Sequence, residues 1–211
     1  MASRSEPRFL VLHGLRLKGF AEAAPVAEGA GLDAAGAEDE LRGLAGEGLV
    51  ARRDGRVSGW SLTPDGRAEH RRLVSEELDG SGAKAVVDDA YRRFLALNPE
   101  LLAVCTAWQL RPEGDASVVN DHGDAAYDGE VVERLARVHE QVAPITDDLA
   151  GELDRYSRYG PRLQAALDKV TAGDVEWFTK PIIDSYHTVW FELHEDLLCT
   201  LGLERSAEAE G

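Results

Sequence analysis

The sequence contains little cysteine, few cationic side chains and no long hydrophobic run. Only two cysteines, Cys105 and Cys199, occur in 211 residues, which is too few for a disulfide-held scaffold. The first apolar run, residues 9–12, is too short for a signal-peptide core, and no stretch approaches a membrane span. Both cysteines lie in apolar helical patterns, so we expect reduced packing residues in a cytoplasmic protein that has no membrane segment.

Cationic side chains are scarce and unevenly distributed. The chain has 23 Lys and Arg against 39 Asp and Glu, a net charge of −16, which argues against a generally basic nucleic-acid coat or a polybasic membrane binder. Residues 1–80 carry a net charge of −3, and residues 81–211 carry −13. The only clearly basic segment is residues 49–72, whose arginines are Arg52, Arg53, Arg56, Arg67, Arg71 and Arg72.

Motifs of enzymes and metal sites are missing. The sequence has no nucleophile elbow, no phosphate-binding loop and no dinucleotide fingerprint. His187 and His194 are separated by about two helical turns, too far to share one zinc ion comfortably. The acidic residues within 121–128 do not match the spacing of a calcium loop. The sequence therefore predicts a protein that is not an enzyme and has neither a cofactor nor a metal ion.

The N-terminal 47 residues predict three helices. Residues 9–20 are apolar on most sides, and their length favours a buried helix over a strand. Residues 21–29 form a second, weaker helical segment, and Asp33 can cap a third helix over residues 34–47. In this third helix the apolar side chains recur at helical spacing and predict a buried face of Ala37, Leu41 and Leu44.

The next segment predicts a β-hairpin followed by a helix. Asp54-Gly55 is typical of a two-residue type I′ turn, because glycine accepts a positive φ and aspartate tolerates it. Short strands would flank this turn, with Trp60 as a core anchor for the hairpin. Thr63 and Pro64 then provide an N-cap and a first-turn proline for a helix that extends to about Leu78.

This order of elements resembles the winged-helix domain of bacterial transcriptional regulators of the MarR and PadR kind. The resemblance covers roughly residues 9–78 and depends on Leu41-x-x-Leu44, on Gly48-Leu49-Val50, and on the run Gly-Trp-Ser-Leu-Thr-Pro-Asp-Gly-Arg at 59–67. It implies double-stranded DNA as partner, with the third helix in the major groove and the hairpin beside the minor groove or phosphates. It also implies a homodimer that reads a palindromic operator.

The residues expected to contact DNA are concentrated on the hairpin. The exposed face of the third helix would consist of small and acidic residues, and Arg42 is its only natural groove contact. The hairpin arginines are expected to project unobstructed from an otherwise anionic molecule and to neutralise phosphates. The full set of predicted DNA-contacting residues is Arg42, Arg52, Arg53, Arg56, Ser58 and Lys18.

A short linker at residues 79–82 is predicted to separate two domains, 1–80 and 83–205, followed by a frayed tail at 206–211. We expect the second domain to be all-helical, because no strand pattern competes there. Pro99 is expected to stop one helix and restart another, and Pro144 to kink or divide the next. Gly160-Pro161 should end a further segment.

The final helix, about residues 182–201, has two adjacent apolar stripes and is therefore expected to be enclosed in a bundle or a dimer. Aromatic side chains with a few polar groups are typical of effector pockets. We therefore consider a ligand site, with the alternative that these aromatics are core and the histidines are satisfied buried groups. The residues of this hypothesis are Trp108, His122, Tyr127, His187 and Trp190.

The sequence thus predicts a mainly α protein, with an N-terminal winged helix bearing a small β-hairpin and a C-terminal all-helical bundle. The expected function is DNA-binding transcriptional regulation, in which the C-terminal domain dimerises and senses a small-molecule effector. One alternative is a winged-helix interaction module without DNA binding, which the acidic third helix favours. Another is a ligand-binding or enzymatic helical bundle, which would need a buried polar cavity around His187.

Overall fold

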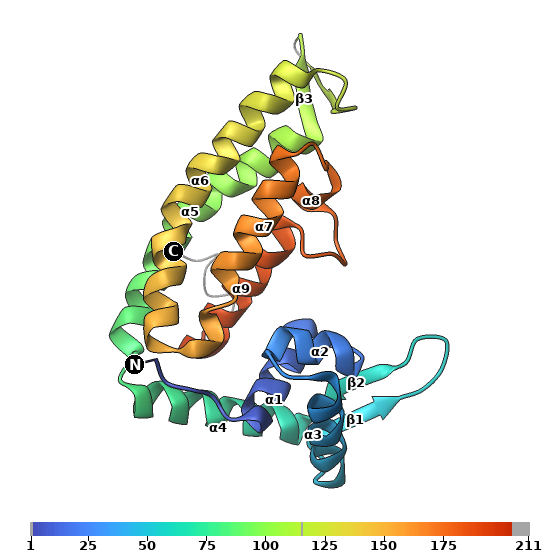
Figure 1. Ribbon diagram of the computed structural model, residues 1–211, viewed down its shortest axis with the longest axis vertical. Coiled ribbons are helices and arrows are strands. Elements are labelled where there is room, and N and C mark those ends of the chain that lie inside the picture. The colour runs from blue at the N-terminus through green and yellow to red at the C-terminus, as the bar shows by residue number, and fades with distance from the viewer. Residues whose placement is uncertain (1, 115, 204–211) are drawn as a thin grey trace. The chain divides into compact units, whose positions relative to one another are not determined.

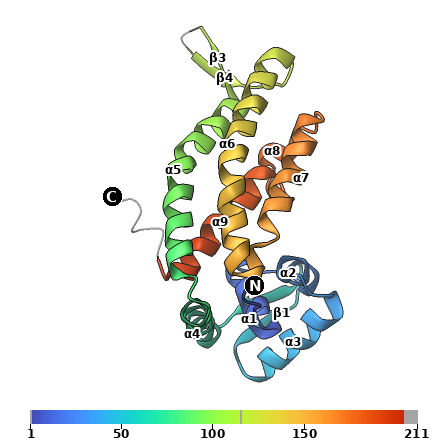
Figure 2. The ribbon, with the colours of Figure 1, turned by 60° about the vertical axis from the view of Figure 1, so that its left-hand side comes forward.

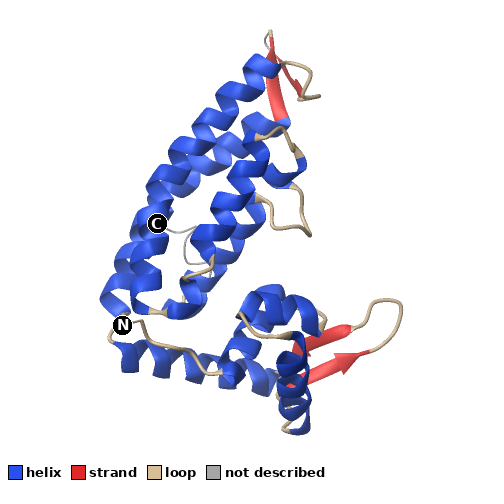
Figure 3. Cartoon of the chain, viewed as in Figure 1, coloured by secondary structure: helices blue, strands red, loops and turns tan. Residues whose placement is uncertain are grey.

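The computed structural model describes residues 2–114 and 116–203, which are mainly helical with two small antiparallel hairpins (Figures 1 and 3). These residues form two compact units. The N-terminal unit contains residues 2–87, 152–155 and 195–203, and the helical unit contains residues 88–151 and 156–194. Two short segments that were expected in the second domain therefore belong to the N-terminal unit, and the tail predicted at 206–211 lies outside the described residues.

Three helices open the N-terminal unit: α1 (Pro7–Lys18), α2 (Ala23–Ala30) and α3 (Ala34–Gly46). The Asp33 carboxylate accepts a hydrogen bond from the Gly36 amide at 2.8 Å, which confirms the predicted N-cap of α3. The predicted buried face of α3 is also confirmed. The core that these helices form with the first hairpin comprises Val11, Leu12, Leu15, Val26, Leu41, Leu44, Val50, Trp60 and Leu62.

Strands β1 (Val50–Arg53) and β2 (Gly59–Leu62) form the first hairpin. The predicted two-residue turn is wrong, because Arg53 pairs with Gly59 and the loop between them has five residues, 54–58. A two-residue turn would have placed Arg53 opposite Arg56, and like charges in directly opposed positions destabilise a hairpin. In the observed loop the Ser58 hydroxyl accepts a hydrogen bond from the Gly55 amide at 3.3 Å.

Trp60 anchors the hairpin to the helices, as predicted. Its side chain is buried, and its backbone amide and carbonyl both bond to Ala21, at 2.8 and 3.1 Å. Ala21 thereby forms an antiparallel bridge with β2 just after α1. The hairpin is consequently held to the helices by backbone hydrogen bonds as well as by apolar packing.

Helix α4 (Pro64–Ser81) follows the hairpin. The Thr63 hydroxyl accepts from the Gly66 amide at 3.0 Å, which confirms the predicted N-cap. The predicted linker at 79–82 is wrong, because the helix continues through Ser81 and ends at Gly82, whose φ is 72°. A glycine in this left-handed conformation is a common helix terminator, so only the last of the four linker residues breaks the helix.

The remaining helices are α5 (Lys84–Gln109), α6 (Ala125–Glu152), α7 (Tyr159–Thr171), α8 (Glu176–Thr179) and α9 (Tyr186–Leu201), with a 3-10 turn over Asp154–Tyr156. Helices α5 and α6 run side by side (Figure 2), and an ion pair of 2.7 Å joins Arg93 to Asp148. In the described residues no helix is both long enough and apolar enough to cross a membrane.

Pro99 and Pro144 do not divide the helices that contain them, and the break predicted at Gly160-Pro161 lies before these residues. Pro99 lies inside α5 and Pro144 inside α6. A proline removes one backbone hydrogen bond. The apolar stripe of α5 nevertheless continues past Pro99, from buried Phe94 to buried Leu101, and α6 likewise has buried side chains on both sides of Pro144. Pro161 lies in the first turn of α7, where a missing N–H costs little. Gly160-Pro161 therefore belongs to the start of α7 and does not end the segment before it.

The helical unit is not all-helical. Strands β3 (Leu110–Glu113) and β4 (Ala116–Val119) form a second antiparallel hairpin between α5 and α6. Gly114, with a φ of 60°, follows the first strand and provides the positive φ that tight hairpin loops require. Pro112 lies inside the first of these strands and argues against a strand there in the sequence, which explains why the second hairpin was not predicted.

Candidate functional site

The β1–β2 hairpin carries three predicted DNA-contacting arginines, of which one is neutralised by carboxylates. Arg52 donates through Nε to the Asp54 carboxylate at 2.8 Å, and its Nη1 lies 3.7 Å from Glu22. Its guanidinium also lies over the Trp60 ring, 5.3 Å from the centroid. The expectation that all three guanidinium groups are unobstructed is therefore wrong for Arg52, because the adjacent Asp54 and the start of α2 compete for it.

Arg53 and Arg56 are exposed, and neither has a carboxylate within ion-pair distance in the described part of the chain. The Arg53 guanidinium lies 4.6 Å from the centre of the Phe20 ring, a cation–π contact that holds the side chain without cancelling its charge. The hairpin extends away from α1–α3 (Figure 1). These two cations are consequently accessible to a large anion.

The other residues that were predicted to contact DNA contribute less available positive charge. Arg42 on α3 is 66% exposed, but it pairs with Glu38 at 3.1 Å and with Asp39 at 3.6 Å. Ser58 is half-buried and its hydroxyl is engaged with the Gly55 backbone. Lys18 is the half-buried last residue of α1. The third helix is thus confirmed as poor in cationic groups that could read base edges.

Two further arginines near the hairpin were not selected by the sequence reasoning. Arg67 and Arg71 are exposed on α4, and neither has a carboxylate partner among the described residues. Arg67 donates to the Leu62 carbonyl at 2.9 Å, which holds its side chain against β2. Their position in the basic segment 49–72 was the signal that could have identified them.

A buried polar network in the N-terminal unit was not predicted from the sequence. The fully buried Arg155 donates to Asp196, to Glu77 at 2.8 Å and to the Thr200 hydroxyl at 2.7 Å. All four residues belong to the N-terminal unit. Buried charges need such partners because desolvation is costly, so this network attaches residues 152–155 and the end of α9 to α4.

Two histidines extend the network into α1 and α4. His13 Nε2 lies 3.0 Å from Asp196, and His13 Nδ1 lies 3.0 Å from His70 Nε2. Arg155 Nη1 also lies 3.4 Å from His13 Nε2. The bond between His13 and His70 joins two ring nitrogens, so which ring donates depends on the protonation of each. Burial, with a smaller contribution from neighbouring His13, lowers the pKa of His70 to about 3. The folded unit therefore keeps His70 neutral.

This low pKa predicts acid sensitivity. An unfolded histidine titrates near its ordinary value of 6.5, so between that pH and about 3 the unfolded chain binds a proton that the folded chain excludes. Stability should fall as the pH falls, by up to about 1.4 kcal/mol per pH unit from this residue. Urea unfolding between pH 7 and 4 should give a shallower pH dependence for His70→Gln, whose amide can donate to or accept from His13 but does not titrate. An equal slope in both proteins would contradict this assignment.

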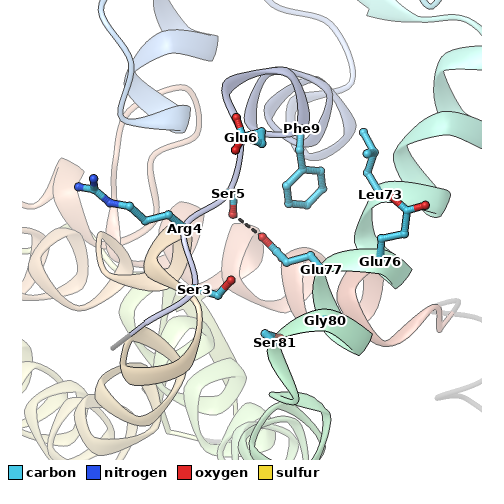
Figure 4. Close-up of a pocket in the computed structure, with 10 residues that line it drawn as sticks. All are labelled: Ser3, Arg4, Ser5, Glu6, Phe9, Leu73, Glu76, Glu77, Gly80 and Ser81. Atoms are coloured by element: carbon cyan, nitrogen blue, oxygen red, sulfur yellow. Dashed lines mark hydrogen bonds between the residues drawn. The ribbon is translucent and has the colours of Figure 1, made fainter.

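A hollow of about 270 Å³ adjoins this network inside the N-terminal unit. Figure 4 shows the Phe9 ring and the Glu77 carboxylate facing it from α1 and α4, with Ser5 bonded to Glu77. Both Glu77 oxygens are engaged, one by Ser5 and one by Arg155. The hollow therefore offers no unpaired buried carboxylate, and its polar side is part of the structural network.

The predicted ligand residues are brought together only in part. Trp108 and His122 have ring centroids 4.4 Å apart and line a hollow of about 360 Å³ in the helical unit. The Tyr127 hydroxyl is engaged with the carbonyls of Ala107 and Leu110, at 2.8 and 3.1 Å. It acts as a tie between α6 and the end of α5.

The two predicted ligand residues on α9 do not line that hollow. Trp190 stacks on Phe94 at 4.4 Å and donates its indole N–H to Asn98 at 3.1 Å, so it packs α9 against α5. His187 is half-buried, and burial lowers its pKa. Trp190 and the buried Tyr186 of α9 thus correspond to the alternative that these aromatic side chains form core.

No group of three or more His, Cys, Asp or Glu side chains within residues 2–114 and 116–203 is arranged to hold a metal ion. Both cysteines are largely buried, which raises the pKa of Cys105 to about 12 and that of Cys199 to about 11 and keeps both thiols protonated at neutral pH. No protein-family model, no curated protein and no solved structure matches this chain.

Proposed function

We propose that this protein is a DNA-binding transcriptional regulator whose N-terminal unit is a winged helix. The order α1, α2, α3, β1, β2, α4 supports this proposal, as does the bridge of Ala21 to Trp60 that fixes the hairpin beside the helices. In winged helices a hairpin of this kind reaches DNA beside the recognition helix. The β1–β2 hairpin is the wing, and α3 is the recognition helix.

The observation that carries the proposal is the uncompensated charge of Arg53 and Arg56. The chain as a whole has a net charge of −16, so most of its surface repels a polyanion. Two exposed guanidinium groups without carboxylate partners at the hairpin provide a local exception. Phosphate neutralisation by such groups releases counterions and supplies most of the affinity of non-specific DNA binding.

Base reading by α3 is expected to be weak. Its exposed face carries Arg42, already paired with two carboxylates, and otherwise mainly alanine, glycine and aspartate. Sequence discrimination usually needs paired hydrogen bonds from Arg, Lys, Asn or Gln to base edges. We therefore expect phosphate contacts of the hairpin to dominate the affinity.

We also propose that the protein acts as a homodimer through the helical unit. Outside the hollow at Trp108 and His122, that unit carries four large apolar side chains that are between 40% and 100% exposed and that a second copy could cover. Sedimentation equilibrium measures this directly. The four side chains are Leu102, Leu110, Ile182 and Phe191.

Fluorescence anisotropy with labelled genomic promoter fragments at low salt tests the DNA proposal. We expect saturable binding by the full chain, and at least tenfold weaker binding by the double variant Arg53→Ala/Arg56→Ala, because two phosphate contacts are lost. The matched control Arg92→Ala/Arg137→Ala removes two exposed arginines from the helical unit and should bind as the wild type does.

A second candidate function predicts a different outcome. The carboxylates Glu38 and Asp39 on α3 occupy its only arginine, which favours an interaction module that binds a protein instead of DNA. In that case no promoter fragment would bind at low salt. Equal weakening by the control variant would show that net charge, and not the hairpin, governs the interaction, and would likewise contradict the regulator proposal.

A further inference from the structure

The hollow in the helical unit lies where three elements meet. Its walls come from the end of α5, from the end of β4 with the loop that follows it, and from α8 with its flanking residues. The apolar part of the lining is Trp108, Val119 and Val175, and the latter two are 76% and 40% exposed. Apolar side chains exposed around a concave surface favour an apolar occupant.

His122 lines this hollow, and one of its ring nitrogens has no partner within the described residues. Asn120 uses its two amide hydrogens on the Trp108 carbonyl at 3.1 Å and on Asp128 Oδ1 at 2.7 Å. Asn120 Nδ2 also lies 3.3 Å from His122 Nδ1, but it has no further hydrogen to donate there. His122 Nδ1 therefore carries a hydrogen and donates it to Asp128 Oδ2 at 3.0 Å, because a carboxylate oxygen accepts. In the neutral ring this leaves Nε2 as an acceptor, and it has no partner in the described part of the chain.

The backbone of His122 is held in an uncommon conformation. Its φ is 59°, in the left-handed region that few non-glycine residues adopt. The His122 amide donates to the Asn120 side chain at 3.2 Å, and Trp108 packs against its ring. The imidazole is thus fixed at both the backbone and the ring, which preorganises Nε2 for a ligand.

The charges around the hollow cancel. Lys180 pairs with Glu176 at 2.6 Å, and both line the hollow. Trp108 is covered by Phe178, which stacks at 4.4 Å, so the ring is a rigid wall. A charged ligand would find no free counter-charge among these residues, whereas an uncharged apolar ligand would lose little hydration free energy on entering the hollow.

We propose that this hollow binds a small, uncharged, mainly apolar molecule whose hydroxyl group donates a hydrogen bond to His122 Nε2. The site deepens the proposed function, in which the ligand would act as the effector. The binding itself involves the helical unit alone and does not require DNA.

Four matched compounds test this ligand chemistry: benzyl alcohol, toluene, benzylamine and benzoate. Titrated into the full-length ¹⁵N-labelled protein, benzyl alcohol should shift amide resonances of the residues that line the hollow, namely 108, 109, 119, 120, 122, 175, 176, 179 and 180. Benzylamine and benzoate should bind more weakly than benzyl alcohol, because neither charge is matched. Shifts located elsewhere, or tighter binding of either charged compound, would overturn the proposal.

The variant His122→Asn isolates the hydrogen bond, because asparagine tolerates the left-handed backbone but does not extend to the Nε2 position. The ratio of the toluene Kd to the benzyl alcohol Kd should fall by about fivefold in this variant, the loss expected for one hydrogen bond. An unchanged ratio would overturn the assigned role of His122. Val119→Glu, an exposed rim substitution, should weaken both compounds, and unaltered binding there would overturn the placement of the site.

Chemical modification gives a second readout. Diethyl pyrocarbonate should react with His122 through its free Nε2, and benzyl alcohol should slow that reaction without slowing the one at His187, which lies outside the hollow. Equal protection of both histidines would contradict the site. The Arg53→Ala/Arg56→Ala variant should bind benzyl alcohol as the wild type does, which separates failure of this site from failure of DNA binding.

Discussion

Replacing Arg155 with methionine is expected to lower the free energy of unfolding of the N-terminal unit by about 3–5 kcal/mol. The Arg155 side chain is completely buried, as is that of its partner Asp196, and Glu77 is only 8% exposed. Methionine fills a similar volume but leaves two buried carboxylates without their counter-ion. Hydrogen exchange of the buried α1 amides at Leu12 and Leu15 measures this loss within the unit itself.

A double-mutant cycle separates the ion pair from general disruption of packing. Asp196→Leu alone should also be strongly destabilising, because it leaves the guanidinium without one of its carboxylates. The combined Arg155→Met/Asp196→Leu variant should be less destabilised than the sum of the two, with a coupling of about 0.5–3 kcal/mol. Additive losses, or wild-type protection of Leu12 in Arg155→Met, would show that the network does not hold the unit together.

The second large effect is expected at Gly66. A Cβ atom there would lie 1.8 Å from the backbone oxygen of Leu49, which cannot move without displacing β1. Gly66→Ala should therefore destabilise the N-terminal unit by about 3 kcal/mol, as overpacking against a fixed backbone does. Thermal unfolding followed by circular dichroism measures the change.

Gly43→Ala provides the matched control with the opposite sign. Gly43 lies in α3, and a Cβ there would meet no atom within 4 Å. Alanine should stabilise the helix by about 0.5–1 kcal/mol, because it restricts the unfolded chain more than glycine does. If Gly66→Ala were as stable as the wild type or, like Gly43→Ala, more stable, the close approach of α4 to Leu49 would be contradicted.

Local signals in the sequence predicted most of the N-terminal unit. The caps at Asp33 and Thr63 depend on residues within one helical turn, so short-range chemistry is enough to locate them. The buried face of α3 followed from helical periodicity alone. The predicted turn at Asp54-Gly55 failed because the register of β1 and β2 depends on which pairs the core buries, and that is a tertiary property.

In the helical unit, local signals in the sequence predicted less of the structure. Pro99 was expected to stop one helix and Pro144 to kink or divide the next, but neither proline divides its helix, because packing over the full length of α5 and α6 outweighs the loss of one hydrogen bond at each. In the N-terminal unit the buried network could not be predicted either, because Arg155 and Asp196 are 41 residues apart and nothing in either local sequence indicates the other. Contacts of this kind arise only from the tertiary fold.

The sequence predicted a part of each candidate site. The basic segment correctly located a cationic hairpin, but the pairing of Arg52 with Asp54 and Glu22 depends on side-chain geometry. Aromatic composition identified Trp108 and His122, which do line a hollow, but Trp190 belongs to the core. The polar partners of His122, namely Asn120 and Asp128, became visible only with the hydrogen-bond network.

The salt dependence of DNA binding tests the central claim most directly. The logarithm of the association constant should fall linearly with the logarithm of the salt concentration, with a slope of about −0.9 for each phosphate neutralised. For Arg53→Ala/Arg56→Ala the slope should be smaller in magnitude by about 1.8, because two phosphate contacts are removed. A slope identical to that of the wild type, with wild-type affinity, would show that these two arginines do not meet DNA.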